Sequence, residues 1–280
     1  MSTPVRAPQS GREHRVELLA LFLAATGRLA TAWHRLTVAQ GTLLLRLQRL
    51  RVSPANVGSI AALRLAIADF NRAVGDFERE ARAVAERWAA IELPAAYRDG
   101  ALRALRSLDR PARLFVWSDR HQMAITGLSA TFYADLIGRI NEAVRRAQAF
   151  ARAARDQART PEGVRTQQLL AAHPLDTVVY ANQARHPVAG WARSATAWQA
   201  VTAANMGALN LARFDLDIEW MEVVDGPECG WTSHPDGDLA HGSIRTVDDC
   251  SAYPLAHPGC IRSFVPRPDL TGRLAEDGGP

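Results

Sequence analysis

The fold is decided between residues 60 and 91, which read IAALRLAIADFNRAVGDFEREARAVAERWAAI. Apolar side chains recur in this stretch at alternating spacings of three and four residues, the heptad pattern of helices that pack lengthwise at a shallow angle. The apolar positions are Ile60, Leu63, Ile67, Phe70, Val74, Phe77, Ala81, Val84, Trp88 and Ile91. A stripe of the same kind runs from Phe22 to Leu50. The sequence therefore predicts two long helices.

Between the two stripes lies a turn-forming segment, SPANVGS at residues 53–59, so the two helices should form an antiparallel hairpin. Pro94 stands where a further helix can start, and Pro111 ends that helix. Another helix is expected from about residue 118 to about residue 159. Residues 1–165 are therefore predicted to form a helical hairpin or bundle.

Charge is unevenly distributed along the chain. All 33 basic residues are arginine, so the chain has no lysine for a Schiff base, a P-loop or a kinase-type site. Residues 1–160 hold 25 arginines against 14 carboxylates, whereas residues 161–280 hold 8 against 15. A basic half suggests a nucleic acid or an acidic protein surface as its partner. Solvated helix faces are the alternative interpretation.

Three arginines recur every seven residues near the end of the last predicted helix of this half. They are Arg145, Arg152 and Arg159. Past Val144 the apolar stripe thins to alanine, so this helix end is expected to project from the body and contact DNA or another anionic partner without reading sequence. A solvated face again remains the alternative.

Residues 166–280 differ in texture from the helical half. Short strands are expected at residues 177–180 and 217–224, with a helix between them at residues 187–213. From Asp225 onward Gly, Pro, Asp, Ser and His dominate, and apolar residues are too few to hold the stretch by core burial alone. The predicted fold class is mainly α, with a small α+β C-terminal domain.

All three cysteines lie in this last stretch, next to histidines. Cys229 and His234 form one close pair, and His257 and Cys260 form a second. Two close pairs joined by a longer loop suit tetrahedral zinc, because each pair can come from one turn. A bound zinc ion would also supply folding energy. Cys250 competes as a ligand, in a set with Cys229, His257 and Cys260.

Other interpretations of the same residues stay open. His241, Asp236 and Asp238 are weaker ligand candidates. The stretch can hold a structural zinc, be a degenerate former zinc knuckle, or hold a catalytic zinc with an open position. It can also be a metal-free loop in which the cysteines pack and the histidines form hydrogen bonds.

The C-terminal segments follow a specific order: a strand with a tryptophan, an Asp before a Cys, a Gly-containing loop and a His-Pro-x-Cys ending. They read EWMEVVDGPECGWTSH (219–234), DLAHG (238–242), YPLAHPGCIR (253–262) and PRPD (266–269). In this order they resemble the C-terminal domain of the Mu F-like minor head proteins of tailed phages, also called phage head morphogenesis proteins. The most similar versions are carried by phages and prophages of high-GC Gram-positive bacteria. The resemblance covers about residues 175–270.

The resemblance implies a structural role inside the procapsid. Proteins of this family associate with the portal or the capsid lining and affect head assembly or the passage of DNA. Portal, capsid and scaffold proteins are the partners it implies, and the virion or procapsid interior is the location, with the host cytoplasm during assembly. We expect no catalytic residues, no membrane partner and no small-molecule substrate.

The chain departs from the broader family pattern in two places. Where many members have a second Cys shortly after the first, this chain has Trp231 and His234, and where many end in Cys-x-Cys, it has Cys260-Ile-Arg262. Within the resemblance, these departures favour one ligand set. It consists of Cys229, His234, His257 and Cys260.

Two other functions remain as alternatives. One is a metal-dependent nuclease of the His-Asn-His type, because His257-Pro-x-Cys with nearby carboxylates can mimic the metal loop of such enzymes. That enzyme needs a helix after the loop, and the residues after Cys260 are rich in proline. The other alternative is a host-directed effector delivered with phage DNA.

Overall fold

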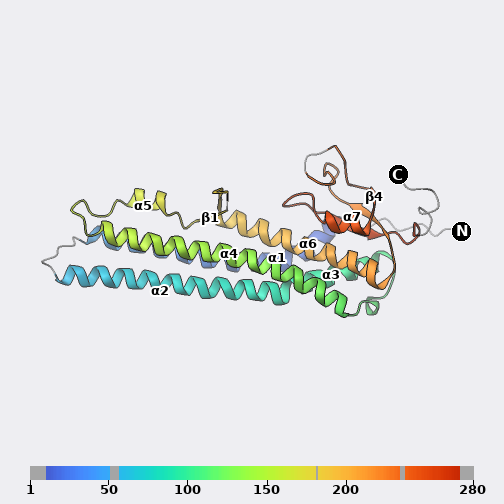
Figure 1. Ribbon diagram of the computed structural model, residues 1–280, viewed down its shortest axis with the longest axis horizontal. Helices are drawn as coiled ribbons and strands as arrows, with labels where there is room; N and C mark the ends of the chain where they lie inside the picture. Colours follow the sequence, from blue (N-terminus) through green and yellow to red (C-terminus); the bar gives the residue numbers. More distant parts are fainter. Residues whose placement is uncertain (1–10, 51–56, 181, 234–236, 272–280) are drawn as a thin grey trace. The chain divides into compact units, whose positions relative to one another are not determined.

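The computed structural model describes residues 11–50, 57–180, 182–233 and 237–271, and the side chains of the helix residues up to 21 are not described. Most of these residues are helical, and small antiparallel sheets lie toward the C-terminus (Figure 1). The predicted fold class, mainly α with a small α+β C-terminal part, is therefore confirmed. Among the described helices, none is both long and apolar enough to span a bilayer.

The elements follow one another along the chain in a simple order. The helices are α1 (Gly11–Arg49), α2 (Val57–Arg87), η1 (Trp88–Glu92, π-helical), α3 (Leu93–Ser107), η2 (Ala112–Leu114, 3-10), α4 (Asp119–Gln157), α5 (Thr166–Ala172), α6 (Val188–Asp215) and α7 (Val247–Ala252). The strands are β1 (Thr177–Val179), β2 (Arg185–Pro187), β3 (Trp220–Val224), β4 (Ile244–Thr246) and β5 (Ser263–Pro266). The helices and strands expected from the sequence are thus present, with boundaries shifted by a few residues.

The chain divides into two compact units, each assembled from several segments. Unit 1 comprises Met1–Ala24, Trp88–Phe132 and Arg193–Pro280, and unit 2 comprises Ala25–Arg87 and Tyr133–Ala192. The boundary expected at residue 165 divides the chain along its sequence instead, and it stays a prediction.

In unit 2, α1 and α2 form the expected antiparallel pair. Arg35 of α1 pairs with Glu80 of α2, and Arg46 of α1 pairs with Asp69 of α2, both at 2.6 Å. Residue numbers therefore rise along α1 while those of the facing residues in α2 fall, as in an antiparallel pair. Between the two helices, the Trp33 ring of α1 makes an edge-to-face contact with the Phe77 ring of α2, at 4.8 Å between ring centroids. The turn predicted for residues 53–59 lies mostly outside the described residues.

The end of α4 does not project, contrary to the expectation. Phe150 is fully buried in unit 2 and meets Phe70 of α2 at 5.3 Å between ring centroids. The alanines that seemed to thin the stripe are themselves buried, since alanine lets two helices approach closely. They are Ala147, Ala151, Ala154 and Ala158.

The π-helical turn η1 interrupts the heptad pattern. Trp88 is buried as expected, but Ile91, the last position of the predicted stripe, is 55% exposed. A π-helical turn inserts an extra residue, which rotates the following residues about the helix axis. Leu93 and Tyr97 are buried in place of the positions that continue the stripe.

In unit 1, α3 and α6 cross in close contact at two glycines. A Cβ added to Gly100 would lie 1.8 Å from the carbonyl oxygen of Ala204, and one added to Gly207 would lie 1.9 Å from that of Tyr97. The crossing therefore brings the two backbones against each other, and only glycine fits at these positions.

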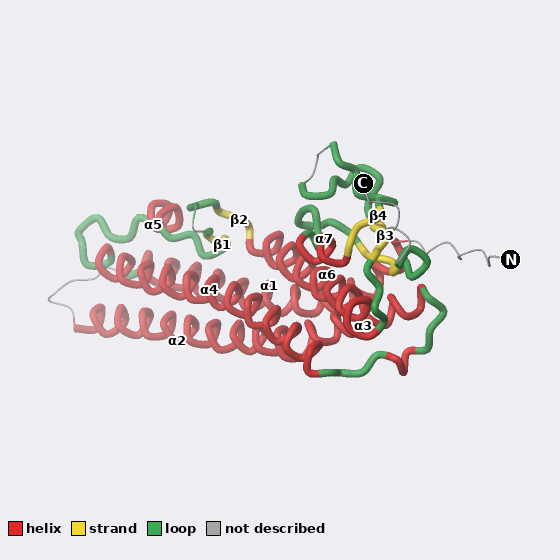
Figure 2. Tube along the Cα trace, turned by 45° about the vertical axis from the view of Figure 1, so that its right-hand side comes forward, coloured by secondary structure: helices red, strands yellow, loops and turns green. Residues whose placement is uncertain are grey.

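The C-terminal sheet has the strand order β4-β3-β5, with antiparallel neighbours. Two of its strands, β3 and β4, are labelled in Figure 2. Met221 and Val223 of β3 face an apolar cluster that includes Leu209 and Ala212 of α6. The residues from Asp225 onward were predicted to be too poor in apolar side chains to hold themselves by core burial alone, and in this cluster α6 and β3 supply part of the apolar surface. The cluster is completed by Ile218, Trp231, Ala240, Val247, Cys250 and Phe264.

Replacing Gly100 by alanine should destabilise the fold, because the added methyl group meets backbone atoms of α6 that cannot turn away. We expect a loss of about 3 kcal/mol in the free energy of unfolding, at the upper end of overpacking effects, measured by urea denaturation. Gly127→Ala is the matched control: Gly127 is exposed on α4 with open space around it, so this change should stabilise by up to about 1 kcal/mol. Equal stability of Gly100→Ala and the wild type would contradict the close crossing.

Candidate metal centre

The first cysteine is held by the turn that follows β3. Asp225 comes directly after the strand, and the N–H of Cys229 donates to the carbonyl of Gly226 at 3.0 Å. A Cβ on Gly226 would lie 3.3 Å from the Cys229 sulfur, so the glycine keeps this turn tight. Gly230 then pairs with Leu239 in an isolated β-bridge. The sulfur is therefore fixed from both sides along the chain.

The second pair of candidate ligands, His257 and Cys260, comes from one turn, as the sequence predicted. The N–H of Cys260 donates to the carbonyl of His257 at 3.0 Å. Gly259 between them has a φ of +90°, a conformation that L side chains rarely adopt. The glycine thus lets the chain reverse within His257-Pro-Gly-Cys260.

The two turns bring three metal-ligating groups together. The ligand atoms of Cys229, His257 and Cys260 all lie within 4.8 Å of one another, and Cys229 Sγ is 3.4 Å from His257 Nε2. Ligands of one tetrahedral zinc ion lie about 3.3–3.8 Å apart, as follows from zinc–ligand bonds of about 2.0–2.3 Å. Small side-chain movements therefore suffice for this Cys-His-Cys group to hold a metal ion.

The orientation of His257 suits a ligand. Its Nδ1 lies 3.1 Å from the carbonyl oxygen of Pro258, so the tautomer with the proton on Nδ1 donates to that oxygen. Nε2 then carries the lone pair and faces Cys229. A hydrogen bond from the second ring nitrogen fixes the tautomer and the ring orientation of metal-bound histidines in the same way.

A fully buried ion pair lies next to the Cys-His-Cys group. Arg262 Nε donates to Asp225 Oδ2 at 2.9 Å, and both side chains have no exposed surface. The remaining guanidinium donors reach three backbone carbonyls. These belong to Gly230 (2.6 Å), Trp231 (2.9 Å) and Tyr253 (2.9 Å). A single arginine thus links the turn after β3, the segment before the His257 turn and the start of β5.

The carboxylate of Asp225 also faces the thiols. Oδ1 accepts from Cys260 Sγ at 3.3 Å and from the N–H of Gly226 at 2.8 Å. Burial, together with the Asp225 carboxylate, raises the pKa of Cys229 to about 12, and burial raises the pKa of Cys260 as well. Both thiols are therefore protonated at neutral pH without a metal, and metal binding must release these protons.

The other predicted ligands are placed differently. His234 and Asp236 lie outside the described residues. Cys250 belongs to the apolar cluster around β3 and not to the Cys-His-Cys group. His241 Nδ1 accepts the N–H of Asp225 at 3.1 Å, and Asp238 pairs with an arginine, Arg245, at 3.0 Å.

Sequence reasoning missed the pair of Asp225 and Arg262 as site residues. Asp225 stands four residues before Cys229, and Arg262 stands two residues after Cys260, so their positions flanking the cysteines were the available signal. In a chain whose cations are all arginine, however, one arginine in a loop does not stand out.

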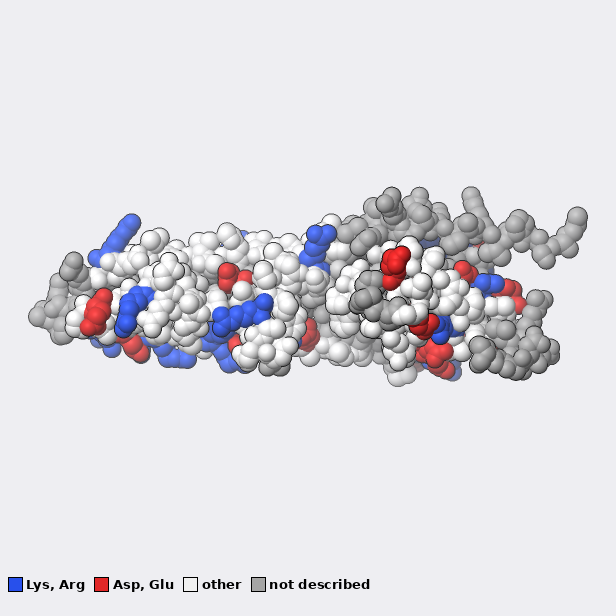
Figure 3. Space-filling view, turned by 90° about the horizontal axis from the view of Figure 1, so that it is seen from above, with Lys and Arg blue, Asp and Glu red and all other residues white. Residues whose placement is uncertain are grey.

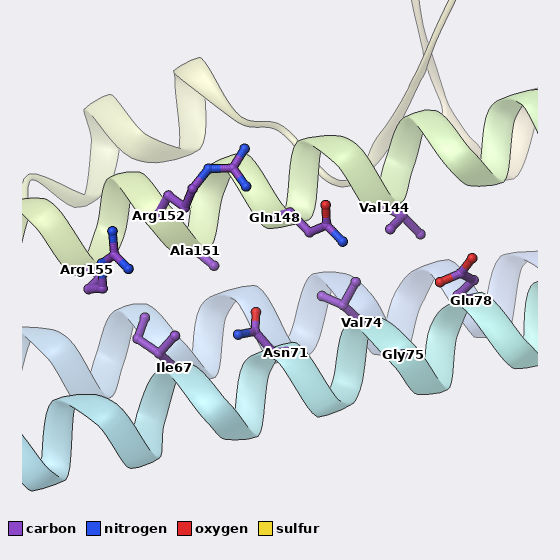
Figure 4. Close-up of a pocket in the computed structure, with 10 residues that line it drawn as sticks. All are labelled: Ile67, Asn71, Val74, Gly75, Glu78, Val144, Gln148, Ala151, Arg152 and Arg155. Atoms are coloured by element: carbon purple, nitrogen blue, oxygen red, sulfur yellow. The ribbon is translucent and has the colours of Figure 1, made fainter.

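The arginines proposed to contact DNA or another partner lie in unit 2. Arg145 is exposed and bonds Glu142 at 2.6 Å. Arg152 lines a groove of about 310 Å³ between α2 and α4, and in Figure 4 Asn71 rises into this groove from α2. Arg159 is exposed just past the end of α4.

Arginines and carboxylates are interspersed on the surface drawn in Figure 3. The described ion pairs of unit 2 also neutralise several arginines of α1 and α2, including Arg35, Arg46 and Arg72. A DNA contact through Arg145, Arg152 and Arg159 stays a prediction.

Comparisons of the chain with protein-family models, with curated proteins and with solved structures gave no match.

The chain should bind one zinc ion, and Cys229→Ser or Cys260→Ser should each abolish this binding, because each removes one of the clustered sulfurs. Metal content is measured by mass spectrometry after dialysis, and cobalt absorbance reports thiolate ligation. Cys250→Ala is the matched control: it removes a cysteine outside the group and should keep the metal. Folded wild-type protein that takes up no metal from equimolar zinc would refute the centre.

Arg262→Met should destabilise the fold by about 3–5 kcal/mol, because it leaves the Asp225 carboxylate buried without its cation. Thermal and urea unfolding measure the change. Arg245→Met is the matched control, since Arg245 also lies over the Trp231 ring, at 4.7 Å against 4.8 Å, but pairs with the exposed Asp238. It should cost at most about 1 kcal/mol.

Adding Asp225→Asn to Arg262→Met should recover part of the lost stability, because no uncompensated buried charge remains. If Arg262→Met and Arg245→Met are equally stable, the ion pair of Asp225 and Arg262 does not stabilise the loops that carry the Cys-His-Cys group.

Proposed function

We propose that the chain is a minor head protein of the Mu F-like kind, acting inside the procapsid of a tailed phage. It associates with the portal or the capsid lining and supports head assembly and the packaging or ejection of DNA. Portal, capsid and scaffold proteins are its partners. It belongs to the virion or procapsid interior and is present in the host cytoplasm during assembly.

One observation carries the proposal: residues from two separate blocks of the Mu F-like pattern come together in the structure. They make one cluster, in which all residues but the half-buried His257 are buried. Its members are Asp225, Cys229, His257, Cys260 and Arg262. Residues that lie far apart in the sequence and share one structural purpose are what an ordered family motif requires. The resemblance itself remains the source of the head-protein assignment.

Zinc is the metal that we propose for this cluster. Two thiolates and an imidazole suit zinc among the common divalent ions. The two cysteines are buried, which suits a closed structural site better than a catalytic site with an open position. His234 is the proposed fourth ligand, as the departures from the family pattern favour.

The nuclease alternative is disfavoured by the chain after Cys260. A His-Asn-His nuclease needs a helix there to present its second metal-binding histidine. In the described residues 261–271 the chain forms β5, antiparallel to β3, and no helix. No observation favours an effector delivered with phage DNA.

In particles of the phage that encodes this chain, the protein should be found at low copy in procapsids, because the proposed role is beside the portal. Quantitative mass spectrometry of purified procapsids and virions measures its ratio to portal protein. Deleting the gene should lower the yield of infectious particles more than the yield of capsid shells.

Complementation links this role to the metal centre. The wild-type chain and Cys250→Ala should restore the yield of infectious particles, whereas Cys229→Ser should restore it poorly. Absence of the protein from both procapsids and virions would rule out the head-protein role.

A further inference from the structure

Two of the three cysteines lie close enough to react with each other. The sulfur atoms of Cys229 and Cys260 lie within 4.8 Å of one another, and both side chains are buried. They belong to one small apolar cluster with Leu255, against which Val201 and Ala256 pack. All of these residues lie in unit 1. The two thiols therefore form a pair inside one compact part of the chain.

The gap between the two sulfurs is short. A disulfide bond is about 2.05 Å long, so sulfurs within 4.8 Å of one another have to approach by at most about 2.8 Å. Rotation of one cysteine side chain between staggered rotamers displaces its sulfur by about 3 Å. The movement that a disulfide between Cys229 and Cys260 requires is thus of the size that side-chain rotation supplies.

Cys250 does not compete for either sulfur. It has no exposed surface and belongs to the apolar cluster around β3, whereas Cys229 and Cys260 belong to a separate cluster. Its sulfur is also not among the ligand atoms that lie within 4.8 Å of one another. The structure therefore favours one pairing among the cysteines of the chain.

Each thiol of the pair has an acceptor beside it for the proton that it must lose. Cys229 Sγ lies 3.4 Å from His257 Nε2, the ring nitrogen that carries the lone pair, and Cys260 donates to Asp225 Oδ1 at 3.3 Å. A base within hydrogen-bond reach of a thiol assists its attack as a nucleophile. Cys229 is the more exposed of the two cysteines, at 8% against 4%, so we expect it to attack first.

Burial slows the reaction but does not oppose its product. Burial and the Asp225 carboxylate raise the pKa of Cys229 to about 12, because both disfavour the negatively charged thiolate. The thiolate is the nucleophile, so the reaction should be slow at neutral pH and faster at mildly alkaline pH. A disulfide carries neither a proton nor a charge, so the same surroundings do not disfavour the oxidised pair.

A metal ion and a disulfide need the same two sulfur atoms. Zinc is bound by thiolates, and a disulfide sulfur has no negative charge to offer a cation. The ligands of one zinc ion also stay about 3.3–3.8 Å apart, well beyond the length of a disulfide bond. Occupation of the site by one therefore excludes the other.

We propose that Cys229 and Cys260 form a reversible disulfide, which replaces the metal when the surroundings become oxidising. The oxidant is a small-molecule disulfide of the glutathione kind. In a reducing compartment the metal joins the turn after β3 to the turn before β5, and in oxidising surroundings the disulfide joins them. The disulfide is independent of the proposed phage role, and only its exchange for the metal rests on the proposed zinc centre.

The reaction consists of two thiol–disulfide exchange steps. In the first, Cys229 Sγ attacks one sulfur of the oxidant, its proton passes through His257 to the departing glutathione thiolate, and a mixed disulfide forms. In the second, Cys260 Sγ attacks Cys229 Sγ, its proton passes through Asp225, and a second glutathione leaves as a thiol. The two cysteines are oxidised, and one glutathione disulfide is reduced to two molecules of glutathione.

The disulfide is tested on the metal-free chain. After equilibration with excess glutathione disulfide at mildly alkaline pH, mass spectrometry should show the loss of two hydrogen atoms. Peptide mapping should join Cys229 to Cys260 and find Cys250 as a thiol, and dithiothreitol should restore the pair. Two cysteines that stay reduced, a stable adduct of glutathione alone, or a bond that involves Cys250 would each overturn the proposal.

Variants add matched controls to the mapping of the wild type. Cys250→Ala removes the cysteine outside the pair and should form the same disulfide to the same extent. Cys229→Ser removes one sulfur of the pair and should form no disulfide within the chain. The wild-type map needs no substitution, so it decides the pairing even where a variant fails to fold.

Competition with the metal is tested on the zinc-loaded chain. Glutathione disulfide should release one zinc ion for each disulfide formed, as a chromogenic zinc chelator reports, and reduction with added zinc should reverse the change. A chain that retains zinc after its pair is oxidised would overturn the exchange. A chain that forms the disulfide but never binds zinc would support the disulfide and refute the zinc centre. A chain that binds zinc, but forms no disulfide after the metal is removed, would overturn the inference and keep the zinc centre.

Discussion

The turns that carry the Cys-His-Cys group, after β3 and before β5, depend on one buried ion pair, that of Asp225 and Arg262. Burying two charges is costly, and the cost is offset only when geometry and additional hydrogen bonds are good. Here the guanidinium makes bonds to the carboxylate and to three carbonyl groups, and the carboxylate receives a thiol and a backbone N–H. Both cysteines stand next to this pair in the chain, Cys229 four residues after Asp225 and Cys260 two residues before Arg262. A metal ion would complete a site whose shape the ion pair already sets.

Much of the fold could be predicted because the spacing of apolar residues along a short stretch of sequence indicates a helix or a strand. Heptad spacing gave α1, α2 and the first part of α4, and alternation gave β3. The Cys-His-Cys group followed from residue types and spacing. The ion pair escaped notice because it joins residues 37 positions apart, and no local pattern marks such a partner. Cys250 illustrates a related difficulty: a free cysteine packs as a small apolar residue, and its sequence position alone does not distinguish a ligand from a core residue.

The packing role of alanine is also difficult to predict from sequence. The end of α4 was expected to lie free because its apolar stripe consists of alanines, yet those alanines are buried beside Phe150. Small side chains bury little area each, but they let two helices come close enough for larger residues on either side to interlock. The glycines at the crossing of α3 and α6 do the same in unit 1, where backbone meets backbone.

The π-helical turn at Trp88–Glu92 limits how such a chain can change in length during evolution. It lets the buried face of α2 and that of α3 each keep its own angular position, although the helical chain runs on between them. One inserted or deleted residue turns everything beyond it by about 100°, whereas a whole heptad returns the face almost to its place. Relatives with longer or shorter helices should therefore differ by multiples of seven residues in α2, with a matching change in α1, and should retain the extra residue of η1.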